Sequence, residues 1–190
     1  MNRLTFAAAS LLLPIVTVIA AAQSAAPGRT PAPAAAVTRP KPAGSLAQIM
    51  RGIFFPNSNL IFDVQHADPA APRKGETGGS ATANYGNAYT GWEIVESAAV
   101  ALTDGVDLIL MAERSCQNGK PVPVRRADYQ KFAREMRAAG LKVLEAARTR
   151  DREKVSDATN DLADACANCH DVYRNAGPAD SPLRCTPPKP

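Results

Sequence analysis

The chain has 190 residues and a formal net charge of +4, with 45% hydrophobic and 21% charged residues. This charge is too small to argue for a nucleic-acid partner, and we expect none. The length fits one domain of ordinary size flanked by shorter segments.

The N-terminus is typical of an export signal. Met1–Arg3 is a short positive segment, Leu4–Ile19 is apolar, and Ala20–Ala22 provides a cleavage site of the A-x-A kind. The alternative is a membrane anchor, but Pro14 interrupts the apolar stretch and no stop-transfer charges follow it. The pattern therefore predicts a cleaved signal peptide over 1–22, an exported protein and no stable membrane anchor.

Two Pro-rich segments flank the expected domain. Residues 23–44 are dominated by Pro and Ala, which predicts an extended linker that buries no core. Residues 177–190 contain five prolines and are expected to form an irregular tail. The folded domain is therefore expected over 45–176.

The first expected helix begins at Ser45, which forms a capping box with Gln48 ahead of an apolar helical repeat. Pro56 interrupts this repeat, so the helix either kinks there or restarts at Asn57 or Ser58. A long Gly-, Pro- and Ala-rich loop follows over 68–89, and the sequence assigns it no role.

Three further amphipathic stretches predict helices over 91–115, after the loop 117–126 as far as 147, and over 151–175. No stretch alternates for long enough to predict a strand. The predicted fold class is all-α, an antiparallel up-down-up-down four-helix bundle, in which cofactors lie between facing helices.

The last helix carries Cys166-Ala167-Asn168-Cys169-His170, the C-x-x-C-H signature of covalent haem attachment. Residues at i, i+3 and i+4 share one helical face, so both thiols and the imidazole can meet one planar cofactor. With 4 Cys and 2 His in the chain, random placement would give this pattern in roughly one of a thousand such chains. A thioredoxin-like site would need a βαβ context, and a structural zinc site would need a second ligand pair. The motif therefore predicts one covalently bound haem c.

A haem motif on the last of four helices, continued as His170-Asp-Val-Tyr173-Arg174, resembles the cytochrome c′ and cytochrome c556 family. The resemblance implies that Cys166 and Cys169 hold the haem and that His170 is the proximal iron ligand. It also implies electron transfer or gas binding rather than enzymatic catalysis. Family members often pair through their first two helices, so the resemblance leaves a homodimer open.

The sixth iron position is the open question at this stage. In an up-down-up-down bundle, Met50 and Met111 lie at about the same depth as His170, whereas Met136 lies deeper and His66 is too far away. Because cytochrome c556-type proteins use a Met from the first helix, Met50 is the candidate distal ligand. The alternative is that Met50 only packs in the core.

Three residues near the motif are expected to shape the haem environment. Arg174 follows His170 by four residues, so it could pair with a haem propionate or remain solvated near the helix C-terminus. Tyr173 and Leu162 are expected to pack against the haem.

Cys116 and Cys185 follow the ends of the second and fourth helices, at the same end of the bundle as the motif. In an oxidising compartment, we expect them to form a disulfide that holds the Pro-rich tail.

The resulting hypothesis is a periplasmic electron carrier that exchanges electrons with redox partner proteins. If Met50 only packs, the iron is five-coordinate, and the alternative is a protein that binds small gases such as nitric oxide or carbon monoxide. A peroxidase would need a distal base or a second haem, and the sequence predicts neither.

Overall fold

The computed structural model describes residues 41–71, 91–175 and 181–187. The predicted signal peptide, most of the linker 23–44, most of the loop 68–89 and half of the tail lie outside these residues. All described residues belong to one compact unit that begins at Arg39. Within the described ranges the regular structure is helical, apart from one isolated bridge between Ser115 and Pro121. No described helix combines the length and apolar character needed to cross a bilayer.

The first helix consists of four consecutive segments: α1 (Leu46–Ile49), the π-helical η1 (Met50–Phe54), α2 (Phe55–Phe62) and the 3₁₀ segment η2 (Asp63–Gln65). Its start is the predicted capping box, in which the Ser45 N–H donates to Gln48 Oε1 at 2.9 Å and the Gln48 N–H donates to Ser45 Oγ at 3.4 Å. Of the two predicted alternatives, a kink at Pro56 or a restart at Asn57 or Ser58, the restart is wrong. The backbone stays helical through Phe55, and Pro56 lies in the first turn of α2, where its missing N–H is tolerated.

Helix α4 (Trp92–Ile109) is shorter than the predicted helix over 91–115. The reason is Arg114, a buried residue whose guanidinium donates to the Leu108 carbonyl at 2.8 Å and to the Gly44 carbonyl at 2.5 Å. These two bonds fold the chain back over the end of α4 and fix it to the segment before α1. A long-range contact of this kind overrides local helix propensity.

Helices α5 (Ala127–Arg148) and α6 (Arg152–His170) agree closely with their predicted ranges. Asp151 caps α6 by accepting the N–H groups of Glu153 and Lys154 at 3.0 and 3.2 Å. After His170 the helix continues as the π-helical segment η3 (Asp171–Asn175).

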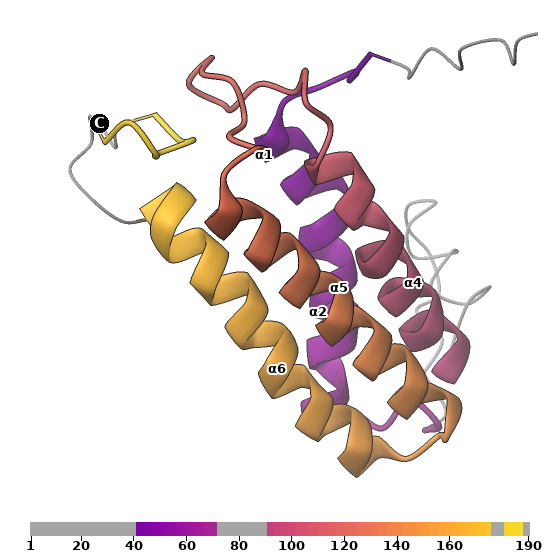
Figure 1. Ribbon diagram of the computed structural model, residues 1–190. Coiled ribbons are helices and arrows are strands. Elements are labelled where there is room, and N and C mark those ends of the chain that lie inside the picture. Colours follow the sequence, from indigo (N-terminus) through magenta and orange to yellow (C-terminus); the bar gives the residue numbers. More distant parts are fainter. Residues whose placement is uncertain (1–40, 72–90, 176–180, 188–190) are drawn as a thin grey trace, which may run out of the picture. The chain divides into compact units, whose positions relative to one another are not determined.

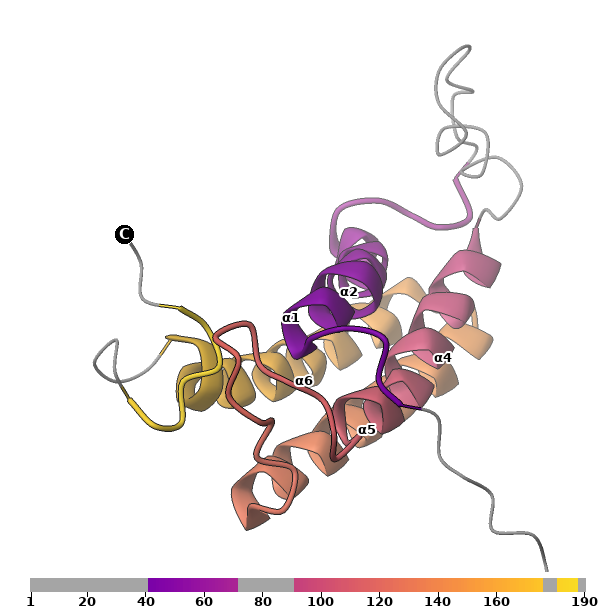
Figure 2. The same ribbon diagram turned by 90° about the horizontal axis from the view of Figure 1, so that it is seen from above.

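These elements form the predicted all-α four-helix bundle (Figures 1 and 2). One end, called the motif end below, brings together the start of α1, the end of α4, the start of α5 and the end of α6. Three hydrogen bonds join these ends: Leu46 N–H to the Ser115 carbonyl at 2.8 Å, Tyr129 OH to the Ile109 carbonyl at 3.0 Å, and Arg126 Nε to Tyr173 OH at 3.3 Å. Because these bonds link helices of alternating direction, they support the up-down-up-down order.

The helices are not equally close to one another. Helix α5 packs against both α4 and α6, whereas the first helix packs against α4 and approaches α6 only through α2 and η2. At the far end, Arg152 donates to the Val64 and Gln65 carbonyls at 2.8 Å each and closes the bundle there. The first helix and α6 therefore diverge toward the motif end.

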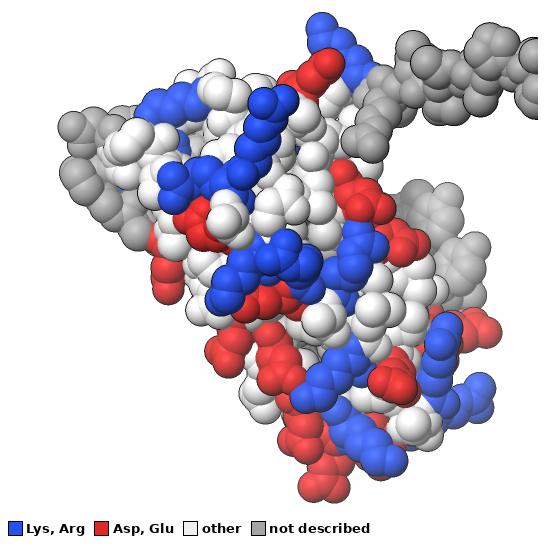
Figure 3. Space-filling model, viewed as in Figure 1, with Lys and Arg blue, Asp and Glu red and all other residues white. Residues whose placement is uncertain are grey.

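The fully buried core lies between the helices and is mainly aliphatic: Ile61, Val64, Val95, Leu102, Val106, Val143, Val155 and Leu162. On the face shown in Figure 3, acidic and basic side chains are interspersed.

Candidate functional site

Cys166, Cys169 and His170 lie in the last turns of α6 and line one cavity. Both cysteines are free thiols and partly buried. Helical spacing brings the three side chains to a single face, as expected for positions i, i+3 and i+4. Helix α6 thus contributes two thiols and one imidazole to the cavity wall.

The cavity has a volume of about 550 Å³ and lies at the motif end, where the first helix and α6 diverge. Its walls are mostly apolar and come from all four helices, with α4 contributing Leu102 and Ile109, and from the tail. Among the described residues, the charged side chains in its lining are Arg51 and Arg174, besides the titratable His170. Cofactor pockets of about 300–1,000 Å³ with few polar groups are typical of proteins.

The first helix forms the wall without cysteines, and Met50 is part of it. The lining residues of this helix are adjacent pairs that recur every four residues and end with a single residue: Leu46 and Ala47, Met50 and Arg51, Phe54 and Phe55, Ser58 and Asn59, and Phe62. Met50 is the first residue of η1. Its carbonyl accepts a hydrogen bond from the Phe55 N–H, five residues further on, which is the π-helical pattern. Met50 and His170 therefore come from different helices to the same cavity.

Burial affects the titratable groups of the α6 wall. It raises the pKa of the Cys166 thiol, and it raises that of Cys169 to about 12, with the neighbouring Cys166 as a further cause. Burial also lowers the pKa of His170, and Arg174 lowers it further. At neutral pH the thiols are thus protonated, while the imidazole is neutral and can offer a nitrogen lone pair to a metal.

Tyr173 and Arg174, from η3, both line the cavity. The Tyr173 ring is buried and packs edge-on against Tyr129, with ring centroids 5.2 Å apart. Arg174 is exposed, and its Nε donates to Asn175 Oδ1 at 2.9 Å. The guanidinium is therefore at the edge of the cavity, next to solvent.

Leu162 does not line the cavity, in contrast to the prediction that it packs against the haem. It is completely buried in the core instead. The reason is helical geometry: Leu162 lies one turn before Cys166, and side chains on a helix tilt toward its N-terminus, away from the motif end.

The alternative iron ligands differ in position. Met136 lines the cavity, with its Sδ 4.0 Å from Cys166 Sγ, so it lies beside a thiol although the depth argument placed it too deep. Met111 lies outside the lining, and its Sδ accepts a hydrogen bond from Arg114 at 3.2 Å. His66 is exposed at the opposite end of the first helix.

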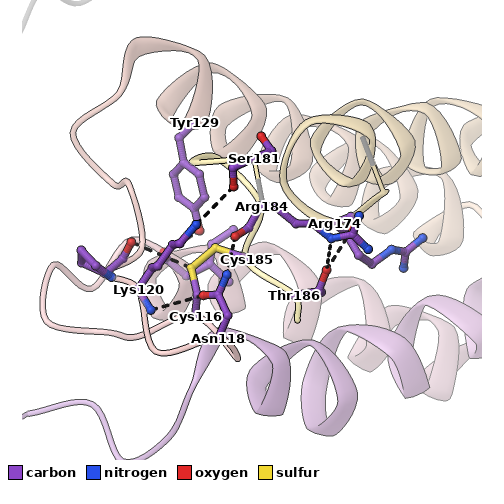
Figure 4. The surroundings of a disulfide bond; sticks show 11 residues. Cys116, Asn118, Lys120, Tyr129, Arg174, Ser181, Arg184, Cys185 and Thr186 are labelled. Carbon is purple, nitrogen blue, oxygen red and sulfur yellow. Dashed lines mark hydrogen bonds between the residues drawn. A yellow bond between two sulfur atoms is a disulfide. The ribbon is translucent and has the colours of Figure 1, made fainter. Parts of the chain in front are cut away.

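Cys116 and Cys185 form a disulfide with their Cα atoms 4.8 Å apart (Figure 4). Cys185 is also part of the cavity wall, together with Thr186 and Gln117. Five further hydrogen bonds hold the tail against the bundle: Cys185 N–H to the Tyr173 carbonyl at 2.8 Å, Gln117 N–H to the Cys185 carbonyl at 3.0 Å, Thr186 Oγ1 to the Arg174 carbonyl at 3.0 Å, Asn118 Nδ2 to the Arg184 carbonyl at 2.6 Å, and Lys120 Nζ to the Ser181 carbonyl at 3.2 Å. Residues 181–187 thus form a fixed rim beside the end of α6.

This cavity fits a c-type haem. Two free thiols stand in the spacing that haem attachment requires, and the following imidazole is neutral and faces the same space. The surrounding walls are apolar, as a porphyrin needs, and the exposed Arg174 stands near solvent, where anionic propionates would lie.

Sequence reasoning named only Met50 from the first helix, although that helix supplies a whole wall. A usable signal was present, since Ala47, Arg51, Phe55 and Asn59 repeat at intervals of four. It was missed because a regular α-helix repeats every 3.6 residues, and the π-helical segment was not foreseen.

Residues 122–174 match the family model described as Cytochrome C′, which confirms the resemblance seen in the sequence. The matched segment runs from the loop before α5 to Arg174, and so contains the complete thiol and imidazole motif. Neither the curated proteins nor the solved structures include a significant match.

Proposed function

We propose that the chain is a c-type cytochrome, in keeping with the match of residues 122–174 to the cytochrome c′ family model, and that it acts as an electron carrier with one covalent haem. In this proposal Cys166 and Cys169 would hold the haem covalently, and His170 and Met50 would supply ligands to its iron. When bound, the haem supplies reversible one-electron oxidation and reduction of its iron.

The observation that most supports this proposal is the composition of the two cavity walls. The α6 wall has both free thiols and the neutral imidazole, while the first helix contributes a thioether, a common sixth ligand of carrier haems. His/Met ligation raises the reduction potential and leaves no open iron position.

The remaining residues have supporting roles in this proposal. Phe54, Phe62 and Tyr129, which line the cavity, would exclude water from a bound haem, and the exposed Arg174 would pair with a propionate. The tail rim at Cys185 limits access to the edge of the cavity.

The export signal read from residues 1–22 supports a periplasmic location, where redox proteins are the expected partners. An enzymatic role finds no support, because His66, the second histidine of the chain, is exposed far from the cavity and offers no distal base.

Gas binding is the second candidate. It is favoured by the phenylalanines next to Met50 in the first-helix wall, since Phe54 and Phe62 would shield an open iron position with apolar side chains.

Optical spectra of the purified holoprotein, with and without carbon monoxide, separate these two functions. We expect a low-spin spectrum that carbon monoxide does not change. Met50→Ala should give a high-spin spectrum that shifts with the gas, while the control Met111→Ala, outside the cavity, should behave as the wild type. A wild-type spectrum that is high-spin and shifts with carbon monoxide would exclude Met50 ligation and favour gas binding.

Covalent attachment is checked on the same sample. The mass of the denatured protein should exceed that of the polypeptide by one haem, and Cys166→Ala combined with Cys169→Ala should abolish this increase.

A further inference from the structure

The π-helical segment η1 changes the direction in which the first half of the first helix faces. Leu46 and Phe62, 16 residues apart, both line the cavity. A regular α-helix rotates by about 100° per residue, so after four full turns these two positions would be about 160° apart. A π-bulge absorbs one residue, which reduces this angle to about 60°. The bulge therefore keeps one continuous face toward the cavity.

Pro56 gives a chemical reason for the bulge. In a regular α-helix its ring would collide with the Gly52 carbonyl, and its nitrogen has no hydrogen to donate. The helix widens before this point, and the Phe55 N–H donates to the Met50 carbonyl, five residues back. Helical geometry then resumes in α2 with Pro56 in its first turn.

Side chains stabilise the irregular backbone on both sides of Pro56. Asn57 Nδ2 donates to the Ile53 carbonyl at 2.7 Å, and both Ser58 Oγ and Asn59 Nδ2 donate to the Phe55 carbonyl, at 3.0 and 2.8 Å. The π-bulge is therefore encoded by these side chains and by Pro56, and π-bulges are frequent at functional sites.

We propose that Pro56 is a positioning residue that, through the π-turn Met50–Phe54, directs Met50 into the cavity opposite His170. The inference deepens the proposed function and rests on it for the role of Met50. Without the bulge, the helix before Gly52 rotates by about 100° relative to α2, and Met50 turns away from the cavity.

The test compares Pro56→Ala with a variant that also lacks Gly52. Pro56→Ala restores the N–H, so the helix can become regular and Met50 should leave the cavity. Deleting Gly52 in that background removes the one extra residue, and a regular helix then returns Met50 to its original direction. Gly52 suits the deletion because it is exposed and, apart from its chain neighbours and the backbone of its own helix, no atom lies within 4 Å of where a Cβ would be. Pro182→Ala, in the exposed part of the tail, is the matched control.

Two readouts are needed on the reduced holoproteins: the optical spectrum with carbon monoxide, and the methyl resonances of ¹³C-methyl-labelled methionine. We expect Pro56→Ala to bind carbon monoxide nearly completely and to lose the strong upfield shift of the Met50 methyl. The variant that also lacks Gly52 should regain the wild-type spectrum and methyl shift, and Pro182→Ala should never lose them.

The outcomes separate the inference from the proposed function. If Pro56→Ala keeps the wild-type methyl shift, Pro56 does not position Met50, and the inference is overturned. If the wild type is itself high-spin and binds carbon monoxide, the Met50 ligand is excluded; the inference then depends on whether the Met50 methyl leaves the haem's ring-current field in Pro56→Ala and returns when Gly52 is deleted. A variant without cooperative unfolding also counts against the inference, since it would mean that Pro56 supports the fold and not only Met50.

Discussion

At the residue scale, Gly140 shows how closely α5 approaches α4. A Cβ atom at this position would lie 2.5 Å from Thr103 Oγ1, a buried hydroxyl that donates to the Ala99 carbonyl at 2.8 Å. A side chain larger than hydrogen fits here only if the Thr103 hydroxyl or one of the two helices shifts.

We therefore expect Gly140→Ala to destabilise the protein by about 1–3 kcal/mol, despite the better helix propensity of Ala. Urea unfolding of the holoprotein measures this. Adding Thr103→Ala removes the hydroxyl from the contact and should recover part of the loss. If the effects of Gly140→Ala and Thr103→Ala on the free energy of unfolding simply add, the close contact is not the cause of the destabilisation.

The ion pair between Arg126 and Asp128 at the start of α5 should make the folding stability depend on pH. The hydrogen bond from Arg126 is the main cause that lowers the pKa of Asp128 from 3.8 to about 2. Because the folded pKa lies below the unfolded one, the stabilisation is complete well above pH 4 and is lost as the pH falls toward 2. Both side chains are partly exposed, at 48% and 34%, so solvent screening keeps the contribution of this pair to stability small.

The difference in melting temperature between wild type and Asp128→Asn should therefore be small and positive at pH 5 and should shrink toward pH 2. Low ionic strength is needed because salt screens the pair. An equal difference at both pH values would mean that the carboxylate charge contributes nothing.

The residues that could be predicted from the sequence are those whose roles are local. Cys166, Cys169 and His170 follow from one helical turn, and Ser45 with Gln48 follows from the capping box. Leu162 lies in the buried core and outside the cavity lining, since periodicity gives the face of a helix but not which part of that face a cavity reaches.

At the element scale, the first helix and α4 depart from expectation for different reasons. Pro56 was expected to kink or interrupt the helix. The preceding π-turn avoids the steric clash and the missing hydrogen bond that a proline causes inside a regular helix. The end of α4 depends on Arg114 reaching the Gly44 carbonyl, 70 residues away in sequence. No local pattern contains a contact of that kind, so the sequence predicted a helix that is too long.

The tail is the element that the disulfide controls. Cys116 and Cys185 are 69 residues apart, so the bridge should contribute roughly 4 kcal/mol in the chain-entropy model. The double variant Cys116→Ala with Cys185→Ala should lose about this amount in urea unfolding. Limited proteolysis should cut it within 181–187 faster than the wild type, because the rim would be held only by hydrogen bonds.

Asn118→Ala is the matched comparison, since it removes one hydrogen bond to the tail and leaves the disulfide intact. It should cost about 1 kcal/mol and cause little additional cleavage. If the double cysteine variant is no less stable than Asn118→Ala, the bridge does not secure the tail.

At the scale of the whole molecule, the helical periodicities and loop lengths were enough to predict the four-helix bundle. They were not enough to predict the cavity, which depends on the divergence of the first helix from α6 at the motif end. That divergence results from packing between distant segments: η2 meets α6 at one end, while Leu46 is held to Ser115 at the other.

The central claim is that one haem lies in this cavity between α6 and the first helix. A crystal structure of the holoprotein tests it most directly. We predict thioether bonds at Cys166 and Cys169, with the iron bound by His170 on one side and Met50 on the other. An iron bound by His170 alone, or by His170 with Met111 or Met136, would contradict the account.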